Sequence, residues 1–187
     1  RNRDFYTTTS PSMDILISSN LERLLYQLCG KDDAVIRDWY GKLSSEGKYA
    51  VSDSVKEKLQ ADFWGGFCDD QETAETIKKT FNEYGYLCDT HTAVAVKVYQ
   101  DYTAQTGDKT KCIIASTASP YKFNDAVLAA ITDEAIPADP FEQAEMLSRI
   151  SGTTPPASLM ELKTKKVRFT DSVEKQQMVE KVKEMLK

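Results

Sequence analysis

Thr117 occupies the position in this sequence that most favours ligand chemistry. It follows the apolar run Cys-Ile-Ile-Ala at residues 112–115, and Ser119 and Pro120 come soon after it. Such a run is typical of a parallel strand covered on both faces, and serine followed by proline is typical of a helix start. In open parallel sheets, ligands bind beyond the carboxyl ends of strands and near helix N-termini. Thr117 is therefore a candidate ligand-binding residue, and the alternative is a turn threonine that satisfies local backbone groups.

Asp89 and His91 are a second candidate pair, because a carboxylate and an imidazole can act together in proton transfer. They lie two positions apart at the expected start of a helix. An acidic side chain at this point can accept hydrogen bonds from the first backbone amides of the helix, while the imidazole points elsewhere. The spacing therefore does not imply a relay between them. His91 is either a catalytic residue or a capping or hydrogen-bonded structural histidine.

A metal site is not expected in this sequence. The cysteines are dispersed without a C-x-x-C pair, and His91 is the single histidine that could assist them. The signatures of P-loops, dinucleotide-binding folds, zinc peptidases and serine hydrolases do not occur either. We expect reduced and buried thiols, as is common for free cysteines, at Cys29, Cys68, Cys88 and Cys112.

The composition is that of an ordinary globular protein. Of the 187 residues, 41% are hydrophobic and 28% are charged, and the formal net charge is -5. A negatively charged chain is a poor match for a phosphate backbone, so nucleic acid is not an expected partner. No apolar stretch approaches the ~18 residues of a membrane span, and no signal-peptide pattern occurs. We expect no membrane partner and a soluble, cytoplasmic protein.

Capping residues and glycines predict a series of helices that would position these side chains. Asp69 and Glu72 have the spacing of a capping box, in which each side chain satisfies a backbone amide of the first turn. Apolar residues recur at helical spacing within each segment, so every helix has one face for a core. The expected helices cover residues 19–29, 32–46, 53–60, 69–84, 90–106, 120–131, 137–151, 155–162 and 172–187.

A small sheet is expected to carry Thr117. Its central strand would be residues 111–116, with flanking strands near residues 5–9 and 63–68. Two glycines within residues 63–68 leave a close backbone approach as the alternative there. Without repeats or Gly/Ser linkers, the expectation is one helix-rich α/β unit over residues 1–187, with a small, mostly parallel sheet flanked by helices.

Three segments of the chain resemble the threonine synthase family. The longest is residues 10–25, Ser-Pro-Ser-Met-Asp-Ile-Leu-Ile-Ser-Ser-Asn-Leu-Glu-Arg-Leu-Leu. Residues 89–95 (Asp-Thr-His-Thr-Ala-Val-Ala) and 115–123 (Ala-Ser-Thr-Ala-Ser-Pro-Tyr-Lys-Phe) follow in the family's order. The resemblance spans nearly the whole chain. It implies a part of the tryptophan-synthase-like fold, which is fold type II of the pyridoxal-phosphate enzymes.

The resemblance also implies a reaction and a cofactor. O-phospho-L-homoserine and water would be converted to L-threonine and phosphate with pyridoxal phosphate. Thr117 matches the hydroxyl residue that hydrogen-bonds the pyridine nitrogen of the cofactor, a contact that tunes the cofactor's electron sink. Lys122 would either help to place an anion or lie on the surface. The segments near the active site contribute Ser10, Ser12, Asp14, Asp89 and His91.

Two family elements have no counterpart in these residues. The lysine that attaches the cofactor and the glycine- and asparagine-rich loop that binds its phosphate lie upstream in the family. We therefore expect residues 1–187 to be the carboxy-terminal part of the catalytic region, inactive alone. Its partner would be the amino-terminal part of the same chain, which would cover an apolar face. The alternatives are a non-catalytic interaction module with this fold and another fold type II enzyme, such as a dehydratase.

Overall fold

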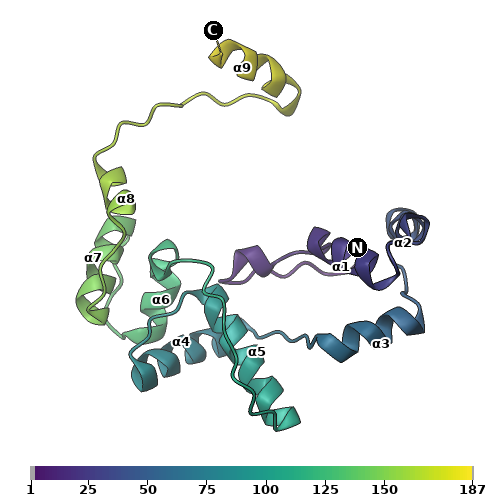
Figure 1. The fold of residues 1–187 in the computed structure, drawn as a ribbon. Coiled ribbons are helices and arrows are strands. Elements are labelled where there is room, and N and C mark those ends of the chain that lie inside the picture. Colours follow the sequence, from purple (N-terminus) through teal and green to yellow (C-terminus); the bar gives the residue numbers. More distant parts are fainter. Residues whose placement is uncertain (1–2, 187) are drawn as a thin grey trace. The chain divides into compact units, whose positions relative to one another are not determined.

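The computed structural model describes residues 3–186 (Figure 1). These residues fall into two compact units, 3–153 and 154–186. The regular elements of the described range are α-helices and short 3-10 helices. None of these helices is both long and apolar enough to cross a membrane.

Three helices around a shared apolar core open the first unit. Ser18, Asp32 and Ser52 each accept a hydrogen bond from a backbone amide of the helix that follows, and so fix its start. α1 packs against both α2 and α3. Their bounds are Ser19–Leu28 for α1, Asp33–Glu46 for α2 and Asp53–Asp62 for α3. The buried core of this cluster consists of Leu25, Ile36, Trp39 and Val55.

A second cluster of helices carries the candidate site. α4 packs against both α5 and α6, and α6 packs against α7 (Figure 1). The bounds are Asp70–Tyr84 for α4, Thr90–Thr106 for α5, Asn124–Ile131 for α6 and Pro140–Ser151 for α7. Their apolar faces are almost fully buried at Ile77, Ala93, Val127, Leu128 and Leu147.

The starts and ends of α4 and α5 confirm the sequence prediction. Asp69 and Glu72 form the expected capping box, and Asp89 caps α5. Both helices end at glycines with positive φ, 65° at Gly85 and 70° at Gly107. Residues with a Cβ rarely adopt this conformation, which explains why glycine ends both helices.

The predicted parallel sheet is wrong for the described residues. Residues 5–9, 63–68 and 111–116 are irregular, and none of them forms a strand. No backbone group of residues 111–116 bonds another backbone group in the described part of the chain, and Ile113 is 96% exposed. An apolar pattern reports which side chains favour burial, whereas a strand also needs a neighbour that supplies hydrogen-bond partners. Residues 3–186 contain no such neighbour for these segments.

The alternative predicted for residues 63–68, a close backbone approach, is confirmed at Gly66. A Cβ on Gly66 would lie 3.1 Å from a ring carbon of Trp64 and 3.1 Å from Cγ1 of Val98 on α5. Trp64 also packs on Tyr102 of α5, with ring centroids 5.6 Å apart. These contacts hold the chain after α3 against α5.

The second unit is short and largely exposed. It contains α8 (Ala157–Met160), η3 (Glu161–Lys163), η4 (Lys175–Gln177) and α9 (Met178–Met185). α8 and α9 lie within the helices predicted near residues 155–162 and 172–187. On α9, Met178, Val182 and Met185 are each 55% exposed. The apolar stripe of this helix is therefore only partly covered within its own unit.

Candidate functional site

Asp89 lies at the centre of the candidate site. It is the N-cap of α5 and is fully buried. Its Oδ1 accepts hydrogen bonds from the backbone amides of His91 (2.9 Å) and Thr92 (3.4 Å), and its Oδ2 accepts one from the Thr92 hydroxyl. The partial positive charge at a helix N-terminus also favours a carboxylate here. Asp89 therefore holds the first turn of α5 in place.

His91 uses both of its ring nitrogens for contacts within the chain, and it is 5% exposed. The backbone amide of Ser12 donates to Nε2 over 3.1 Å, so Nε2 is the acceptor and Nδ1 carries the ring hydrogen. Nδ1 lies 3.3 Å from the Thr90 hydroxyl and 3.3 Å from Asp89 Oδ1, and either oxygen can accept that hydrogen. Since no lone pair is left for a substrate, this geometry favours the structural alternative over a catalytic base.

Asp14 shapes the loop before α1. Its carboxylate accepts hydrogen bonds from the Thr8 backbone amide (2.7 Å) and hydroxyl (2.8 Å), which closes a loop around η1 (Pro11–Met13). Ser10 in this loop is 2% exposed, and its hydroxyl has no partner among the described residues. A buried hydroxyl without a partner costs about 1–3 kcal/mol. Ser10 therefore retains hydrogen-bonding capacity.

Ser116 connects the segment around Thr117 to α5. Its hydroxyl oxygen lies 3.3 Å from the hydroxyl oxygen of Thr92. The Tyr86 hydroxyl donates to Ser116 over 3.1 Å. Thr92 itself is buried in the first turn of α5 beside Asp89. The residue before Thr117 is thus tied to the start of this helix.

Phe123 adds an apolar contact at the same end of α5. Its ring packs on that of His91, with centroids 4.8 Å apart and planes tilted by 50°. Contacts of this kind contribute about 0.5–1.5 kcal/mol beyond the burial of surface. Three segments that are distant in sequence, residues 8–14, 89–92 and 116–123, therefore meet at the N-terminus of α5.

Thr117 and Lys122 have polar groups that are not engaged in this way. Thr117 is exposed, and its hydroxyl has no hydrogen-bond partner among the described residues. Lys122 is exposed with its Nζ 5.8 Å from the centre of the Phe123 ring. The sequence predicted an α-helix directly after Ser119. The chain instead forms a 3-10 turn, η2 (Pro120–Lys122), before α6 begins.

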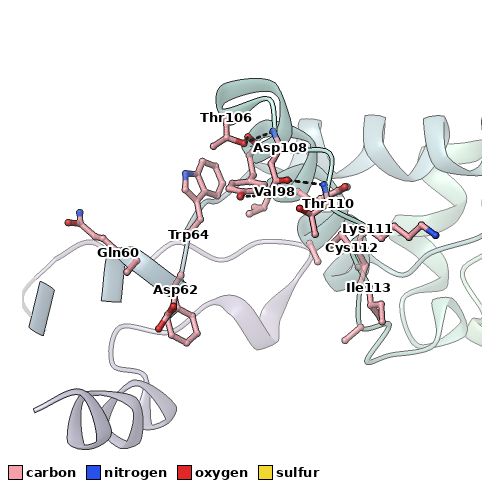
Figure 2. Close-up of a pocket in the computed structure, with 17 residues that line it drawn as sticks. Gln60, Asp62, Trp64, Val98, Thr106, Asp108, Thr110, Lys111, Cys112 and Ile113 are labelled. Carbon is pink, nitrogen blue, oxygen red and sulfur yellow. Dashed lines mark hydrogen bonds between the residues drawn. The ribbon is translucent and has the colours of Figure 1, made fainter. Parts of the chain in front are cut away.

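A groove of about 880 Å³ lies beside the segment that leads to Thr117 (Figure 2). Its walls come from the end of α3 and the two residues after it (60–64), from α5 and from residues between 108 and 115, and Trp64 and Val98 contribute apolar surface. The groove reaches Ala115, two positions before Thr117. Sequence reasoning did not predict it, because its walls come from segments that no local pattern connects.

Asp108 lines this groove and fixes the turn after α5. Hydrogen bonds from Thr110, including its backbone amide at 2.8 Å, and from the Tyr102 hydroxyl at 2.7 Å lower the pKa of Asp108 to about 2. The same contact raises the pKa of Tyr102. Figure 2 shows the contact between Thr110 and Asp108 as a dashed line. Asp108 is therefore ionised throughout the physiological pH range.

The cysteines only partly follow the expectation of burial. Cys88 is fully buried, and this burial raises the pKa of its thiol to about 11. Cys29 and Cys68 are half-buried, and Cys112 is exposed, which corrects the prediction for that residue. All four are free thiols. Within residues 3–186, no group of three or more His, Cys, Asp or Glu side chains is arranged to hold a metal ion.

Residues 92–185 match the family model described as "Threonine synthase, C-terminal". The match covers half of the chain and includes most of α5 and the whole of the segment around Thr117. The chain belongs to the threonine synthase family. The family predicted from the three segments is thus confirmed. Human Threonine synthase-like 1 is 41% identical over 132 residues, which are 70% of this chain and 17% of the human protein.

Two solved threonine synthases share the fold of this family member. The crystal structure of threonine synthase from yeast has a TM-score of 0.79 and 33% identity, and the match covers 100% of this chain and 38% of the yeast chain. The crystal structure of pyridoxal-phosphate-bound threonine synthase from Brucella melitensis has a TM-score of 0.74 and 33% identity, covering 96% of this chain and 34% of that one. The chain therefore spans much less than the full length of these relatives.

Sequence reasoning missed three residues that connect the segments of the candidate site. Thr92 and Ser116 link α5 to the segment of Thr117, and Tyr86 extends the link. Thr92 and Ser116 lie inside two of the family segments, so that position was the available signal. Nothing in the sequence marks Tyr86.

Proposed function

We propose that this chain is the carboxy-terminal part of the catalytic region of a threonine synthase. The whole protein would convert O-phospho-L-homoserine and water to L-threonine and phosphate, with pyridoxal phosphate as cofactor. One observation carries the proposal: the three family segments meet at the N-terminus of α5 and leave Thr117 beside it with an unengaged hydroxyl.

Pyridoxal phosphate fits the chemistry of Thr117. An exposed hydroxyl without a partner among the described residues can hydrogen-bond the pyridine nitrogen. A neutral hydroxyl does not enforce protonation of that nitrogen as a carboxylate would, so Thr117 tunes how strongly the ring withdraws electrons. The bound cofactor supplies the electron sink for bonds made and broken on the amino-acid substrate.

The other predicted site residues divide into two groups under this proposal. Those whose polar groups are engaged within the chain hold the segments around the site, namely Ser12 through its backbone amide, Asp14, Asp89 and His91. The Ser10 hydroxyl is buried without a partner among the described residues, and the Lys122 ammonium group is exposed. Lys122 either helps to place an anion, such as the phosphate of the substrate, or lies on the surface of the whole protein.

The remaining machinery would come from the amino-terminal part of the same polypeptide. The cofactor lysine and the phosphate-binding loop belong to that part in the family, and this chain spans only 17% to 38% of the relatives described above. Residues 111–116 make no backbone–backbone hydrogen bonds within the described residues, and Ile113 is exposed. The amino-terminal part would cover this surface. Residues 1–187 alone would be inactive, and the whole protein would be cytoplasmic.

Replacing Thr117 in the whole protein tests the proposal. Thr117→Val removes the hydroxyl and keeps the shape, whereas Thr117→Ser keeps the hydroxyl and is the matched control. We expect formation of L-threonine and phosphate from O-phospho-L-homoserine to fall about fivefold in the valine variant, because a hydrogen bond between neutral groups contributes about 1 kcal/mol net. The serine variant should stay near the parent rate. An unchanged rate with valine would remove Thr117 from the cofactor site.

A second candidate is a non-catalytic interaction module on the same fold. It is favoured by the name of the human relative, which is threonine synthase-like rather than threonine synthase. The intact mass of the endogenous polypeptide, isolated with an antibody against these 187 residues, separates the two candidates. A much longer polypeptide that contains the cofactor lysine supports the enzyme. A polypeptide of about this length supports the module.

A further inference from the structure

Ser116 is the point at which the stretch around Thr117 is hydrogen-bonded to the rest of the first unit. Within residues 111–118, the hydrogen bonds found in the described part of the chain all involve the Ser116 hydroxyl. Its partners are the hydroxyls of Tyr86 and Thr92. The placement of Thr117 therefore depends on these two contacts more than on any backbone pairing.

The Ser116 oxygen is the acceptor in both of its contacts. The Tyr86 hydroxyl donates to it over 3.1 Å and the Thr92 hydroxyl over 3.3 Å. Thr92 Oγ1 also donates to Asp89 Oδ2, so its single hydrogen is shared between the carboxylate and Ser116. The three hydroxyls therefore form a chain of contacts that connects residue 116 to a buried carboxylate.

Capping of α5 does not require this chain of hydroxyls. Asp89 Oδ1 alone accepts from the backbone amides of His91 and Thr92, which are the bonds that define an N-cap. Oδ2 is left for the Thr92 hydroxyl. Valine would fill the space of the 3% exposed Thr92 equally well, so packing does not explain a hydroxyl here either.

We infer that Thr92 and Ser116 are positioning residues, which hold the hydroxyl of Thr117 ready for the pyridine nitrogen, with Asp89 as the fixed end. This inference rests on the proposed function, because it takes the contact between Thr117 and the cofactor from there. In this inference both residues act through residue 117 and not by a contact of their own with the cofactor. A pre-ordered hydroxyl loses less freedom on binding than a mobile one, so the arrangement raises cofactor affinity.

The test compares Thr92→Val with Thr92→Ser in the whole protein. The first readout is the 15N chemical shift of the pyridine nitrogen in bound, 15N-labelled pyridoxal phosphate, which responds to hydrogen bonding at that atom. The second is the dissociation constant of the cofactor. We expect valine to move the shift toward that of Thr117→Val and to weaken binding about fivefold, as for the loss of one net hydrogen bond. Serine should restore both values, which a packing role would not require.

Ser116→Ala repeats the test at an exposed residue, where we expect a smaller effect on folding than at the buried Thr92. We expect it to match Thr92→Val. Tyr86→Phe removes one of the two donors to Ser116 and leaves the contact through Thr92 to Asp89 in place, so it should change both readouts less. If Thr92→Val unfolds the protein, Ser116→Ala decides. If Ser116→Ala keeps the parent shift and affinity while Thr117→Val changes both, the inference is overturned and the proposed function stands. If Thr117→Val also changes neither, the proposed contact is refuted and the inference falls with it.

Discussion

Replacing His91 tests whether this residue anchors the loop before α1. Its Nε2 accepts from the Ser12 amide at 3.1 Å, and its Nδ1 faces Asp89 and Thr90 at 3.3 Å. Glutamine can place an amide oxygen near the position of Nε2, whereas the shorter asparagine reaches only the position of Nδ1. His91→Gln therefore keeps the acceptor for Ser12, and His91→Asn loses it.

The structure gives the size of each loss. The hydrogen bond to the Ser12 amide contributes about 1 kcal/mol net. The contact between the rings of His91 and Phe123, with centroids 4.8 Å apart, contributes about another 1 kcal/mol. His91→Asn removes both, so we expect the free energy of unfolding to fall by about 2 kcal/mol, and by about 1 kcal/mol for His91→Gln. Urea unfolding of the whole protein, followed by circular dichroism, measures both differences.

Limited proteolysis supplies the second assay for His91. Once the Ser12 contact is lost, the loop of residues 8–14 is no longer held to α5, so cleavage in this loop should be faster in His91→Asn than in His91→Gln. Equal destabilisation by the two substitutions, together with equal cleavage rates in the loop, would refute the anchoring role of His91.

Two further predictions concern α5 and its surroundings. The pKa of Asp108 is about 2, below its ordinary value of 3.8, so its stabilising contribution is present above about pH 4 and is lost as the pH falls toward 2. The unfolding free energies of the parent and of Asp108→Asn should therefore converge over this range in acid titrations, and a constant difference would contradict the assignment. Gly66→Ala should lower the Tm, because the added methyl would lie 3.1 Å from Val98, whereas Gly65→Ala meets open space and is its control. Equal Tm values for the two variants would show that the chain after α3 does not pack this closely on α5.

Helix boundaries could be predicted from the sequence because their determinants are local. Capping by Asp69 and Asp89, and the helix ends at Gly85 and Gly107, depend on contacts within about one helical turn. The sheet could not be predicted in this way, because a strand needs a partner that its own residues do not specify. Residues 111–116 have the apolar pattern of a strand but find no pairing neighbour within the described part of the chain.

The sequence could predict which segments belong to the candidate site, but not which of their residues contact one another. The family segments contain Ser12, His91, Thr92 and Ser116, all of which meet at the start of α5. Ser12 and His91 are 79 positions apart, and Thr92 and Ser116 are 24 apart. Neither periodicity nor spacing reports such pairs, because each joins an irregular segment to a helix that is distant in the sequence.

The hydrogen bonds of the site separate residues that build it from residues that can bind. Asp89 and His91 are the residue types most readily associated with proton transfer, yet backbone amides and neighbouring hydroxyls occupy their polar atoms. A group whose lone pairs already accept hydrogen bonds within the chain is poorly placed to take a proton from a substrate. The hydroxyl of Thr117 is a poorer proton donor and acceptor than a carboxylate or an imidazole. It is, however, exposed and has no hydrogen-bond partner within the described residues. Substitution of Thr117 should therefore alter cofactor binding at nearly constant stability. Substitution of His91 should mainly lower the free energy of unfolding. It should change cofactor binding only indirectly, through displacement of the loop before α1 and of Phe123.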